Sequence, residues 1–366
     1  MKILIWVTRY FPYIGGIETV VHSLVQALCS MKQDVLVISQ NVESDDTQVI
    51  CIDGVIVHLI PYFFAIQKYD LKKINKNLEE THKIIEAFSP DIINIHGFYE
   101  HLAFYQVRIL EKKQYPIVIT LHGLLEQKSY QSTACFKLWA MAKNINTVSK
   151  ALIEELNQKN ITHKNTIRVI YNGIFLAPSV NVLIENTFNI LAIGRLSQEK
   201  GFEFLFYAVK ALLKKYPKIK LTLLGDGDQM NPLLLLKNTL QLNEAITMTG
   251  FLQNNQIAHY IDAAALIVMP SSYESFGLVA VEAANRFKPV IASNVGGLKE
   301  VIAHEETGIL VKPSDANALA NAIDYLLSDR EKMQRMGIAA KKRAQDLFSL
   351  EKMTQAYLAL YHEALQ

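Results

Sequence analysis

Short apolar runs alternate with longer amphipathic segments along the whole chain. The first half holds one series of apolar runs, with the helical pattern GIETVVHSLVQALCSM after the first of them: KILIWVT, DVLVIS, PDIINIHG, PIVITLHG and INTVSK. After a polar stretch at residues 178–186 a second series follows: FNILAIGRL, the helical FEFLFYAVKALLKKY, IKLTLLGDGD, ITMTG, ALIVMPSS, PVIAS and GILVK. Apolar runs separated by helical segments are typical of βαβ units around a parallel sheet.

The two series predict an α/β fold of two tandem Rossmann-like, doubly wound domains. A chain of 366 residues, 50% of them hydrophobic, exceeds what one core usually organises. We place the first domain at residues 1–175, the second at 176–345 and a C-terminal helix at 346–366. The pattern of that helix does not decide between the domains, and we expect it to pack back toward the first. Because ligands bind beyond the carboxyl ends of strands in open α/β sheets, we expect the site in a cleft between facing domains.

Composition excludes several classes of function. The formal charge of +2 comes from nearly equal numbers of acidic and basic residues, so we expect no nucleic-acid partner. Cys29, Cys51 and Cys135 fit neither a disulfide framework nor a zinc site, which favours a cytoplasmic location. Arg9 interrupts the N-terminal apolar run, which we interpret as a buried strand and not as a signal peptide. No uncharged apolar stretch approaches the roughly 20 residues that span a bilayer.

The stretch YESFGLVAVEAANRF carries two glutamates, Glu274 and Glu282, around a glycine. In one continuous helix they would stand about 80° apart, so they would not share a face. A strand ending at Pro270, a loop and a helix from Gly277 explain the pattern better. The unpaired backbone N–H groups at such a helix start favour an anion such as phosphate, and they belong to Phe276, Gly277, Leu278 and Val279.

The structural alternative is that Glu274 is a solvated loop residue and Glu282 a partly buried helix residue with an ion-pair partner. A short motif matches by chance often enough that this alternative stays open on these residues alone. A retaining glycoside hydrolase is disfavoured, because its two carboxylates must flank one bond at about 5 Å.

The segment PSSYESFGLVAVEAANRFKPVIASNVGGLKEVI resembles the donor-binding region of glycosyltransferase family 4, retaining enzymes of the GT-B fold. GGIETVV resembles the glycine-rich first loop of the family, and GRLSQEKG and LLGDGD resemble the start of its second domain. In the same order as in the family, PDIINIHG and TLHG resemble its mid-domain strands, and NTVSK and VIYNGI resemble the approach to its interdomain linker. The resemblance covers nearly the whole chain, and the second domain is its more specific half. Phe175 departs from the pattern, since the family often has an aspartate there.

The resemblance implies a role for each matching residue of the second domain. Glu282 should hold the ribose hydroxyls of a nucleotide, and Glu274 the hydroxyls of the transferred sugar. The backbone from Phe276 to Val279 should receive the sugar and the distal phosphate. Arg195 and Lys200 should grip the diphosphate, and their charge suits a leaving phosphate independently of the resemblance. The contacts to the base are expected around Gly250 and Phe251.

In the first domain, the resemblance implies that Gly15 and Gly16 close over the diphosphate and that His122 lies near the donor sugar. Each has a structural alternative, because a glycine pair also marks a tight turn and a lone histidine after a strand is more often structural. His96, in a similar sequence context, competes with His122. LLGDGD lacks the third glycine of a dinucleotide fingerprint, which disfavours an oxidoreductase.

The resemblance therefore implies a retaining hexosyltransferase that uses a nucleotide diphosphate sugar of the UDP or GDP type and no further cofactor. No Asp-x-Asp stands in a convincing site context, so we expect no required metal. The acceptor is expected to be a glycan or a lipid-linked precursor in polysaccharide, lipopolysaccharide or glycoconjugate synthesis. Two alternatives are a nucleotide-sugar epimerase of the same architecture and a non-catalytic, sugar-nucleotide-binding partner subunit.

A peripheral contact with the inner membrane surface is a separate hypothesis. In FFAIQKYDLKKINKN, residues 63–77, aromatic residues precede four lysines, a composition that suits an anionic leaflet. The alternative, which we favour slightly, is an ordinary amphipathic helix with a solvated basic face.

Overall fold

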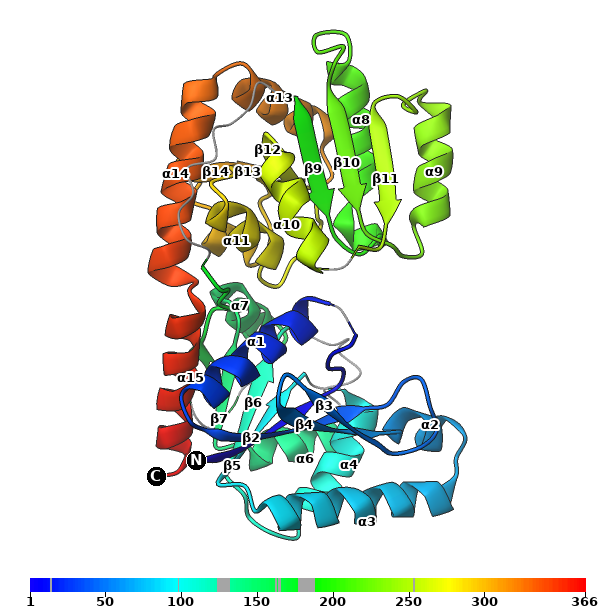
Figure 1. Ribbon diagram of the computed structural model, residues 1–366, viewed down its shortest axis with the longest axis vertical. Coiled ribbons are helices and arrows are strands. Elements are labelled where there is room, and N and C mark those ends of the chain that lie inside the picture. Colours follow the sequence, from blue (N-terminus) through cyan, green and yellow to red (C-terminus); the bar gives the residue numbers. More distant parts are fainter. Residues whose placement is uncertain are drawn as a thin grey trace. The chain divides into compact units, whose positions relative to one another are not determined.

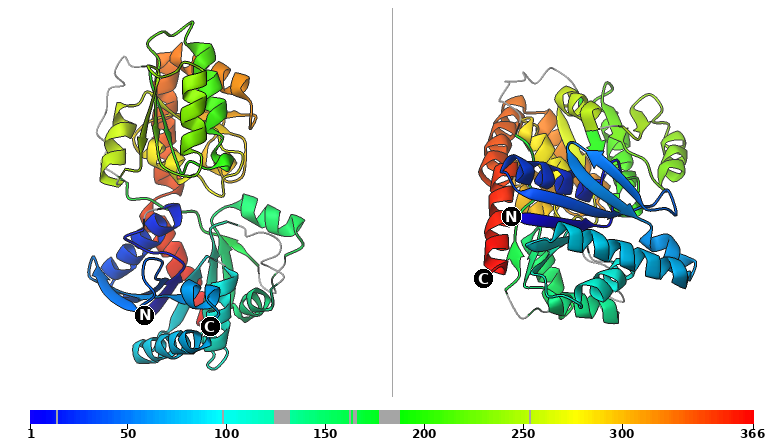
Figure 2. Two further views of the ribbon diagram at one scale, coloured as in Figure 1. Left: turned by 90° about the vertical axis from the view of Figure 1, so that its right-hand side faces the viewer. Right: turned by 60° about the horizontal axis from the view of Figure 1, so that its bottom comes forward.

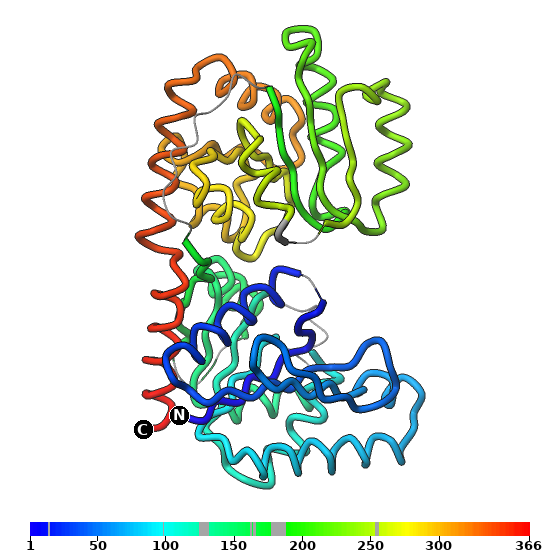
Figure 3. Tube along the Cα trace, in the orientation of Figure 1, coloured from blue at the N-terminus to red at the C-terminus, as the bar shows by residue number. Residues whose placement is uncertain are grey.

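The computed structural model describes residues 1–13, 15–97, 99–123, 132–161, 163, 166–176, 188–252 and 254–366. The chain forms two compact units, a first unit of Met1–Phe175 with Leu350–Gln366 and a second unit of Leu176–Ser349. The tube in Figure 3 follows the chain out of the first unit, through the second and back, so that the red C-terminal segment ends beside blue and cyan segments. Both termini therefore belong to the first unit (Figure 2).

The first unit is built on a sheet with the strand order β3-β4-β2-β1-β5-β6-β7-β8. Its strands are β1 (Lys2–Val7), β2 (Asp34–Gln40), β3 (Gln48–Ile52), β4 (Val55–Ile60), β5 (Ile92–His96), β6 (Ile117–Leu121), β7 (Asn144–Thr147) and β8 (Arg168–Val169). Neighbours pair in parallel except β3 and β4, which form an antiparallel hairpin. At its turn Asp53 and Gly54 both have positive φ, 47° and 81°, the geometry for which an Asp-Gly pair is selected.

Helices cover this sheet, and the last of them comes from the end of the chain. They are α1 (Gly16–Ser30), α2 (Tyr62–Gln67), α3 (Leu71–Phe88), α4 (Glu100–Leu110), α6 (Thr133–Met141), α7 (Lys150–Gln158) and α15 (Leu350–Ala364). Helix α15 lies against α1 and β6 (Figure 1). The tyrosine hydroxyls of α15 reach the sheet, since Asn94 Nδ2 donates to Tyr361 at 2.7 Å and Asn146 Nδ2 donates to Tyr357 at 3.4 Å.

The basic segment 63–77 forms two helices and not one. Tyr69 has a φ of 52° between α2 and α3, and Asp70 caps the start of α3. Lys68 and Lys73 both pair with Asp45, at 3.1 and 2.6 Å, so part of the positive charge of the segment is neutralised within the fold. Membrane contact gains no support from this arrangement. Among the described residues, no helix combines the length and apolar content that crossing a bilayer requires.

The second unit has a parallel sheet with the order β11-β10-β9-β12-β13-β14. Its strands are β9 (Asn189–Ile193), β10 (Lys220–Leu224), β11 (Ile246–Gly250), β12 (Leu266–Met269), β13 (Val290–Ser293) and β14 (Gly308–Val311). Its helices are the 3₁₀ turn η1 (Gln198–Lys200), α8 (Phe202–Leu212), α9 (Met230–Thr239), α10 (Asn254–Ala263), α11 (Leu278–Asn285), α12 (Leu298–Val301), α13 (Ala316–Leu327) and α14 (Arg330–Leu347). Counted within the unit, this is the 3-2-1-4-5-6 order of the Rossmann fold.

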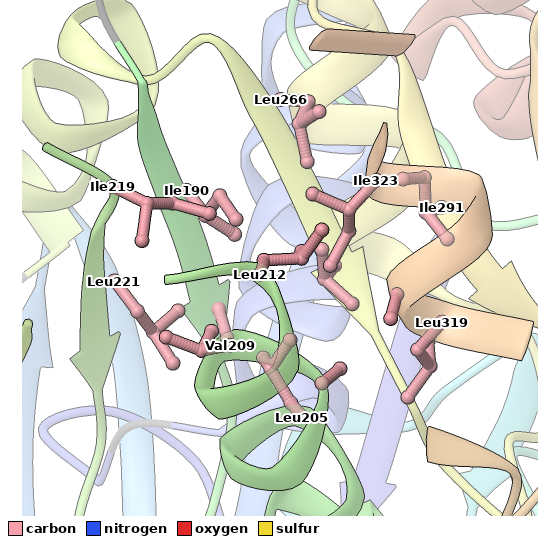
Figure 4. Packing of buried hydrophobic residues seen from close by; sticks show 14 of the residues in the cluster. Ile190, Leu205, Val209, Leu212, Ile219, Leu221, Leu266, Ile291, Leu319 and Ile323 are labelled. Atoms are coloured by element: carbon pink, nitrogen blue, oxygen red, sulfur yellow. The ribbon is translucent and has the colours of Figure 1, made fainter. Parts of the chain in front are cut away.

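The core of the second unit packs helices onto this sheet. Figure 4 shows Leu205, Val209 and Leu212 of α8 beside Ile190 of β9 and Leu221 of β10. Helix α13 contributes to the same cluster and contacts α8 along its length. Burying the apolar face of α8 fixes the start of that helix, and therefore the turn that leads into it from β9.

Each sheet has one point at which its strand order reverses. In the second unit this switch point lies between β9 and β12, and in the first unit between β1 and β5. At a switch point the loops leaving two neighbouring strands run in opposite directions and leave a crevice at their carboxyl ends. Among the described residues, 194–201, 270–277, 8–13, 15–16 and 97 follow these strands and are therefore the candidate site.

Candidate functional site

Two loops meet at the switch point of the second unit. Residues 194–201 follow β9 and residues 270–277 follow β12. The Ser272 N–H donates to Glu199 O at 2.7 Å, and Lys200 Nζ donates to Glu274 Oε2 at 2.7 Å. Gly201 has a φ of 62°, and a Cβ there would stand 2.4 Å from Pro270 O, so glycine permits the close approach. Two motifs that are far apart in sequence thus form one structure.

The Lys200–Glu274 ion pair is the central feature of this site. The two side chains are 21% and 15% exposed, so the pair is sheltered without being sealed from solvent. A charge-assisted hydrogen bond of this length is strong, and each partner neutralises the other. Lys200 and Glu274 are already bonded to each other. A phosphate that binds Lys200 must therefore compete with Glu274, and a hydroxyl that binds Glu274 must compete with Lys200.

Arg195 lies in the same loop but points outward. Its side chain is 75% exposed, and Nη2 contacts Glu199 Oε1 at 3.2 Å. The Ser197 hydroxyl donates to the same carboxylate oxygen at 2.6 Å. Burial raises the pKa of Glu199, but the hydrogen bond from Ser197 and the charge of Arg195 outweigh it, so that the pKa lies below its usual value. Glu199 therefore stays ionised and holds Arg195 at the rim of the loop.

The start of helix α11 lies at the end of the second loop. Gly277 is its N-cap with a φ of 107°, and the first bond of the helix runs from the Ala280 N–H to Gly277 O at 3.0 Å. The amides of Gly277, Leu278 and Val279 precede that bond, which is where a helix offers N–H groups to an anion. The Phe276 ring is buried and packs edge-on against Phe348, with ring centroids 5.6 Å apart, so it anchors the backbone.

A second glycine pair supports this loop from behind. The Gly297 N–H donates to Glu274 O at 2.9 Å. A Cβ on Gly296, whose φ is 45°, would lie 1.9 Å from Glu274 O, and one on Gly297 would lie 2.5 Å from the Phe276 Cα. The backbone that carries Glu274 is thus held by a contact that only glycine allows.

Glu282 lies in the second turn of α11 and is partly buried. Burial raises the pKa of its carboxyl to about 7, while the charge of Arg286 lowers it. Arg286 itself is paired with Asp262 and does not neutralise Glu282 fully. The carboxyl is therefore poised between its charged and neutral forms near neutral pH.

The LLGDGD segment supports the Arg195 loop and does not form a dinucleotide fingerprint. A Cβ on Gly225 would lie 1.9 Å from Gly194 O, and one on Gly227 would lie 2.4 Å from Leu196 O. The Leu196 N–H donates to Asp226 O at 2.8 Å. Glycine is needed at positions 225 and 227 because the backbone there lies directly against the backbone of Gly194 and Leu196.

Gly250 and Phe251 lie beside this segment, at the end of β11. The Gly225 N–H donates to Gly250 O at 3.0 Å, and Gly250 has a φ of 73°. Phe251 is 56% exposed. An exposed ring and a close backbone are suited to a planar ligand group.

The glycine-rich loop of the first unit leaves β1 at the other switch point. Gly15 is the N-cap of α1, and the Thr19 N–H donates to Gly15 O at 3.0 Å. A Cβ on Gly15 would lie 2.4 Å from Glu18 Oε2, whereas one on Gly16 would meet nothing within 4 Å. The Glu18 carboxylate is the flexible end of a side chain, so this contact does not by itself require glycine at position 15, and the space beside Gly16 is open.

A hydrogen-bonded chain ties this loop to α1 and to the β3–β4 turn. The buried Tyr10 hydroxyl contacts His22 Nδ1 at 3.0 Å, and His22 Nε2 contacts Asp53 Oδ2 at 3.1 Å. Burial lowers the pKa of His22, and Asp53 raises it less. A neutral His22 that donates to Asp53 and accepts from Tyr10 satisfies all three groups.

His122 and His96 form a pair at the carboxyl ends of β6 and β5. His96 Nδ1 and His122 Nε2 are 3.0 Å apart, and the residues are 0% and 6% exposed. Burial lowers the pKa of His122 to about 4 and that of His96 well below its usual value, with the charge of His122 acting in the same direction on His96. Both rings are neutral at physiological pH.

Comparison with known proteins places this chain in a family. The sequence model described as Glycosyl transferases group 1 matches residues 177–343, and the one described as Glycosyltransferase Family 4 matches residues 14–177. An uncharacterized glycosyltransferase of Methanocaldococcus jannaschii is 30% identical over 381 residues, which cover 99% of this chain and 98% of that protein. The chain belongs to the group 1 glycosyltransferases.

Solved structures share the fold of this group 1 glycosyltransferase. Sucrose-phosphate synthase from Thermosynechococcus elongatus has a TM-score of 0.83 at 24% identity, over 99% of both chains. HepE from Anabaena, solved in complex with UDP-glucose, has a TM-score of 0.79 at 21% identity, over 98% of this chain and 99% of that one. The expected fold class, two Rossmann-like α/β domains of the GT-B type, is confirmed. The cleft between the domains stays a prediction.

The structure of this glycosyltransferase brings the expected residues into two groups. Arg195, Lys200, Glu274 and the start of α11 gather in the second unit. Gly15, Gly16 and His122 follow strands of the first unit, and Phe175 is 77% exposed at the end of that unit's first segment. The roles of these residues stay predictions.

Sequence reasoning missed the residues that hold the site in place. Glu199, Gly296 and Gly297 fall inside the quoted motifs, and a glycine pair after a strand was the one signal available for the last two. His96 was named only as a competitor of His122, but the structure makes it a partner. Among the described residues, no group of three or more His, Cys, Asp or Glu side chains is arranged to hold a metal ion.

Proposed function

We propose that this glycosyltransferase is a retaining, metal-independent hexosyltransferase that moves a sugar from a nucleotide diphosphate sugar to a glycan or lipid-linked acceptor. The donor is of the UDP or GDP type, and the product belongs to polysaccharide, lipopolysaccharide or another glycoconjugate. HepE, whose structure holds UDP-glucose, supports a nucleotide sugar as the class of donor.

The observation that carries this proposal is the 2.7 Å contact between Lys200 and Glu274 beside the start of α11. A cation, a carboxylate and the amides at the start of α11 offer one ligand three kinds of contact at one switch point, although Lys200 and Glu274 are 74 residues apart in sequence. A cation and amides suit a phosphate, and a carboxylate suits sugar hydroxyls. A nucleotide diphosphate sugar presents both groups next to each other.

The chemistry assigned to these residues is the departure of the diphosphate. As the glycosidic bond to the donor phosphate breaks, negative charge grows on the leaving phosphate oxygens. We assign the stabilisation of that charge to Lys200, Arg195 and the amides of α11, for which Arg195 must turn inward from its contact with Glu199. Removing one such donor typically costs about 100-fold or more in turnover. These groups would do the work that a divalent metal does elsewhere.

The remaining assignments follow the same donor along its length. Glu274 holds hydroxyls of the transferred sugar, Glu282 the ribose, and the backbone near Gly250 and Phe251 the base. Gly15 and Gly16 contact the diphosphate, and His122 the sugar. For retention, the acceptor hydroxyl enters from the side of the leaving group, and a phosphate oxygen takes its proton.

Thermal unfolding with UDP, GDP and ADP, each with and without magnesium, tests the donor site. A ligand at 100 times its dissociation constant adds about 2.7 kcal/mol of stability, which is visible as a raised midpoint. We expect UDP or GDP to raise the midpoint equally with magnesium and with chelator. A shift that needs magnesium would contradict metal independence.

The variant Glu274→Ala tests the enzyme itself. It should lose transfer while still binding the nucleotide, because Lys200 and the α11 amides remain. Glu244→Ala, at an exposed position of the same unit, is the control and should keep wild-type turnover. Product formed from the donor sugar alone would identify an epimerase, and nucleotide binding without turnover by the wild type would identify a non-catalytic subunit.

Product stereochemistry and membrane binding need their own measurements. The anomeric coupling constant of the product distinguishes retention from inversion by NMR. Liposome flotation with and without anionic lipid tests a peripheral membrane contact, and failure to float with either would remove it.

A further inference from the structure

The contact between His96 and His122 limits where each of the two rings can carry its proton. Two neutral imidazole nitrogens 3.0 Å apart share one proton, so one ring donates and the other accepts. The ring that donates carries its proton on the bonded nitrogen, and the ring that accepts carries its proton on its other nitrogen.

The second nitrogen of His96 decides the direction. His96 Nε2 is fully buried and has no hydrogen-bond partner among the described residues. If His96 accepted at Nδ1, its only proton would sit on Nε2, and a buried N–H would be left without a partner. Buried N–H groups without a partner are rare, because burial then costs the full desolvation of a donor. The favoured arrangement has the proton on His96 Nδ1, donated to His122 Nε2.

We infer that His96 is a positioning residue that fixes His122 as its Nδ1–H tautomer. A neutral His122 that accepts at Nε2 must carry its own proton on Nδ1. Nδ1 is the nitrogen that the pair leaves available, and His122 keeps 6% of its surface accessible. His122 therefore presents a hydrogen-bond donor to a ligand, and it is neither a cation nor a general base.

The surroundings of His96 hold its ring in place. The His96 ring stacks on that of His122 at 28° with centroids 5.3 Å apart, and the Tyr357 ring of α15 lies at 5.9 Å, centroid to centroid. Tyr357 is itself hydrogen-bonded to Asn146 of β7. Because the pKa of both histidines is lowered by burial, the tautomer is set throughout the neutral range.

This inference rests on the proposed function in one respect, the contact of His122 with the transferred sugar. A donor N–H at that place would bind a sugar hydroxyl oxygen and orient the donor sugar for the transfer step. Since all sugar hydroxyls also donate, a histidine that only accepted would select a different hydroxyl orientation. The pair would thus set the direction of the hydrogen bond between His122 and that hydroxyl.

The tautomer is measured directly on the wild-type protein without substrate. In long-range ¹H–¹⁵N NMR spectra of protein labelled with ¹⁵N-histidine, the Nδ1–H and Nε2–H tautomers give distinct patterns. The spectra of His96→Asn and His122→Asn assign the two rings. We expect both rings as Nδ1–H from pH 6 to 8, and an Nε2–H pattern for His122 would overturn the inference.

Two variants then separate positioning from simple structural support. His96→Asn keeps an N–H near the place of Nδ1, whereas His96→Leu removes it. We expect His96→Leu to lower kcat about 10-fold or more with the nucleotide dissociation constant within 2-fold of wild type, and His96→Asn to recover most of that loss. Equal losses in both variants would overturn the positioning role.

The failure of the proposed function would look different. A wild-type protein that binds none of the nucleotides would refute the donor site, while the NMR tautomer of His122 would still be measured. If His96→Leu fails to fold, the wild-type spectrum and His96→Asn still decide the inference.

Discussion

Lys200 and Glu274 neutralise each other's charge in the protein without a ligand. Each side chain is sheltered, and each has the other as its partner at 2.7 Å. The pair keeps both residues ordered in the free protein, but a ligand must compete with it. Removing either residue therefore has two effects, the loss of a ligand contact and the release of the other residue.

Lys200→Met should weaken binding of the nucleoside diphosphate about 10- to 100-fold, because a charge-assisted hydrogen bond to phosphate is worth about 1.5–3 kcal/mol. Isothermal titration calorimetry with the nucleotide identified by thermal unfolding measures the change. The control is Lys218→Met, an exposed lysine of the same unit, which should bind as wild type does. Equal binding by Lys200→Met and wild type would remove Lys200 from the phosphate site.

Glu282 makes the stability of the free protein depend on pH. Its pKa is raised to about 7 in the folded protein, so the fold favours the neutral carboxyl. The stabilisation is present below the unfolded pKa of about 4.3 and is lost as pH rises through about 7. At one pKa unit per 1.36 kcal/mol, deprotonation costs the folded state about 3 kcal/mol by pH 8.

Glu282→Gln keeps the neutral shape and removes this loss. We expect the variant to exceed wild type in stability at pH 8 by about 2–3 kcal/mol and to approach it near pH 4.5, as measured by urea unfolding across that range. Glu244→Gln, at an exposed position, should show no such trend. A pH-independent difference between Glu282→Gln and wild type would contradict the raised pKa.

At the scale of elements, the loops at the switch points are supported by glycine contacts. The contact of Gly296 with the Glu274 carbonyl leaves no room for a side chain, and its backbone has positive φ. The carboxylate of Glu274 is thus positioned by residues that never touch a ligand.

Gly296→Ala should push the loop that carries Glu274 out of place. We expect a destabilisation of about 1–3 kcal/mol from backbone strain, together with loss of transfer. Gly54→Ala is a matched control, since Gly54 also has positive φ but has nothing within 4 Å of a Cβ. Gly54→Ala should lose only the stability that the positive φ costs, whereas Gly296→Ala should lose more because its Cβ also clashes with Glu274 O, and only Gly296→Ala should lose transfer. Full turnover by Gly296→Ala would show that the contact is dispensable.

The sequence predicts elements better than the contacts between them. The parallel strands and the helix start at Gly277 follow from local patterns, because burial on both faces of a strand and an N-terminal glycine leave a local trace. The alternation of apolar runs does not reveal the β3–β4 hairpin, although its Asp53-Gly54 turn carries the usual signal. The pattern of the aromatic and basic segment 63–77 indicates one helix, whereas Tyr69 and Asp70 divide it.

The contacts within the site have no local signal. Lys200 and Glu274 are 74 residues apart, and His96 and His122 are 26 apart, so only the strand order brings them together. Motif resemblance named three of these four residues for the site but not their pairing. The partner of a charged or polar side chain depends on which strands are neighbours, and the periodicity of one segment does not contain that.

At the scale of the whole molecule, the chain crosses from the first unit to the second and returns. Helix α15 buries Met353, Tyr357, Leu360 and Tyr361 in the first unit. Helix α15 also provides hydrogen-bond acceptors for polar side chains of the sheet, since Asn94 and Asn146 donate to the two tyrosine hydroxyls. The first unit is thus completed by the last residues of the sequence.

Truncation after Ser349 should therefore destabilise the first unit and spare the second. Removal of α15 exposes an apolar face and takes away the tyrosine hydroxyls that accept from the side-chain N–H groups of Asn94 and Asn146, and each lost hydrogen bond costs about 0.5–1.5 kcal/mol. Hydrogen exchange with mass spectrometry should show lost protection in β5, β6 and β7, with β9 and β12 unchanged. Truncation after Ala364 is the control, and loss of protection in both units alike would contradict this independence.

The return of α15 has a further consequence during synthesis. Residues 350–366 leave the ribosome only after the whole of the second unit. One face of the first sheet therefore stays exposed until α15 is synthesised. At about 5–20 residues per second, that interval lasts roughly 10 to 35 seconds. During this time the nascent chain exposes an apolar sheet face and the side-chain N–H groups that the two tyrosines will later accept from, and exposed apolar surface is what holding chaperones bind. Any codon change that slows translation of residues 176–349 lengthens the wait, without altering a single contact of the finished protein.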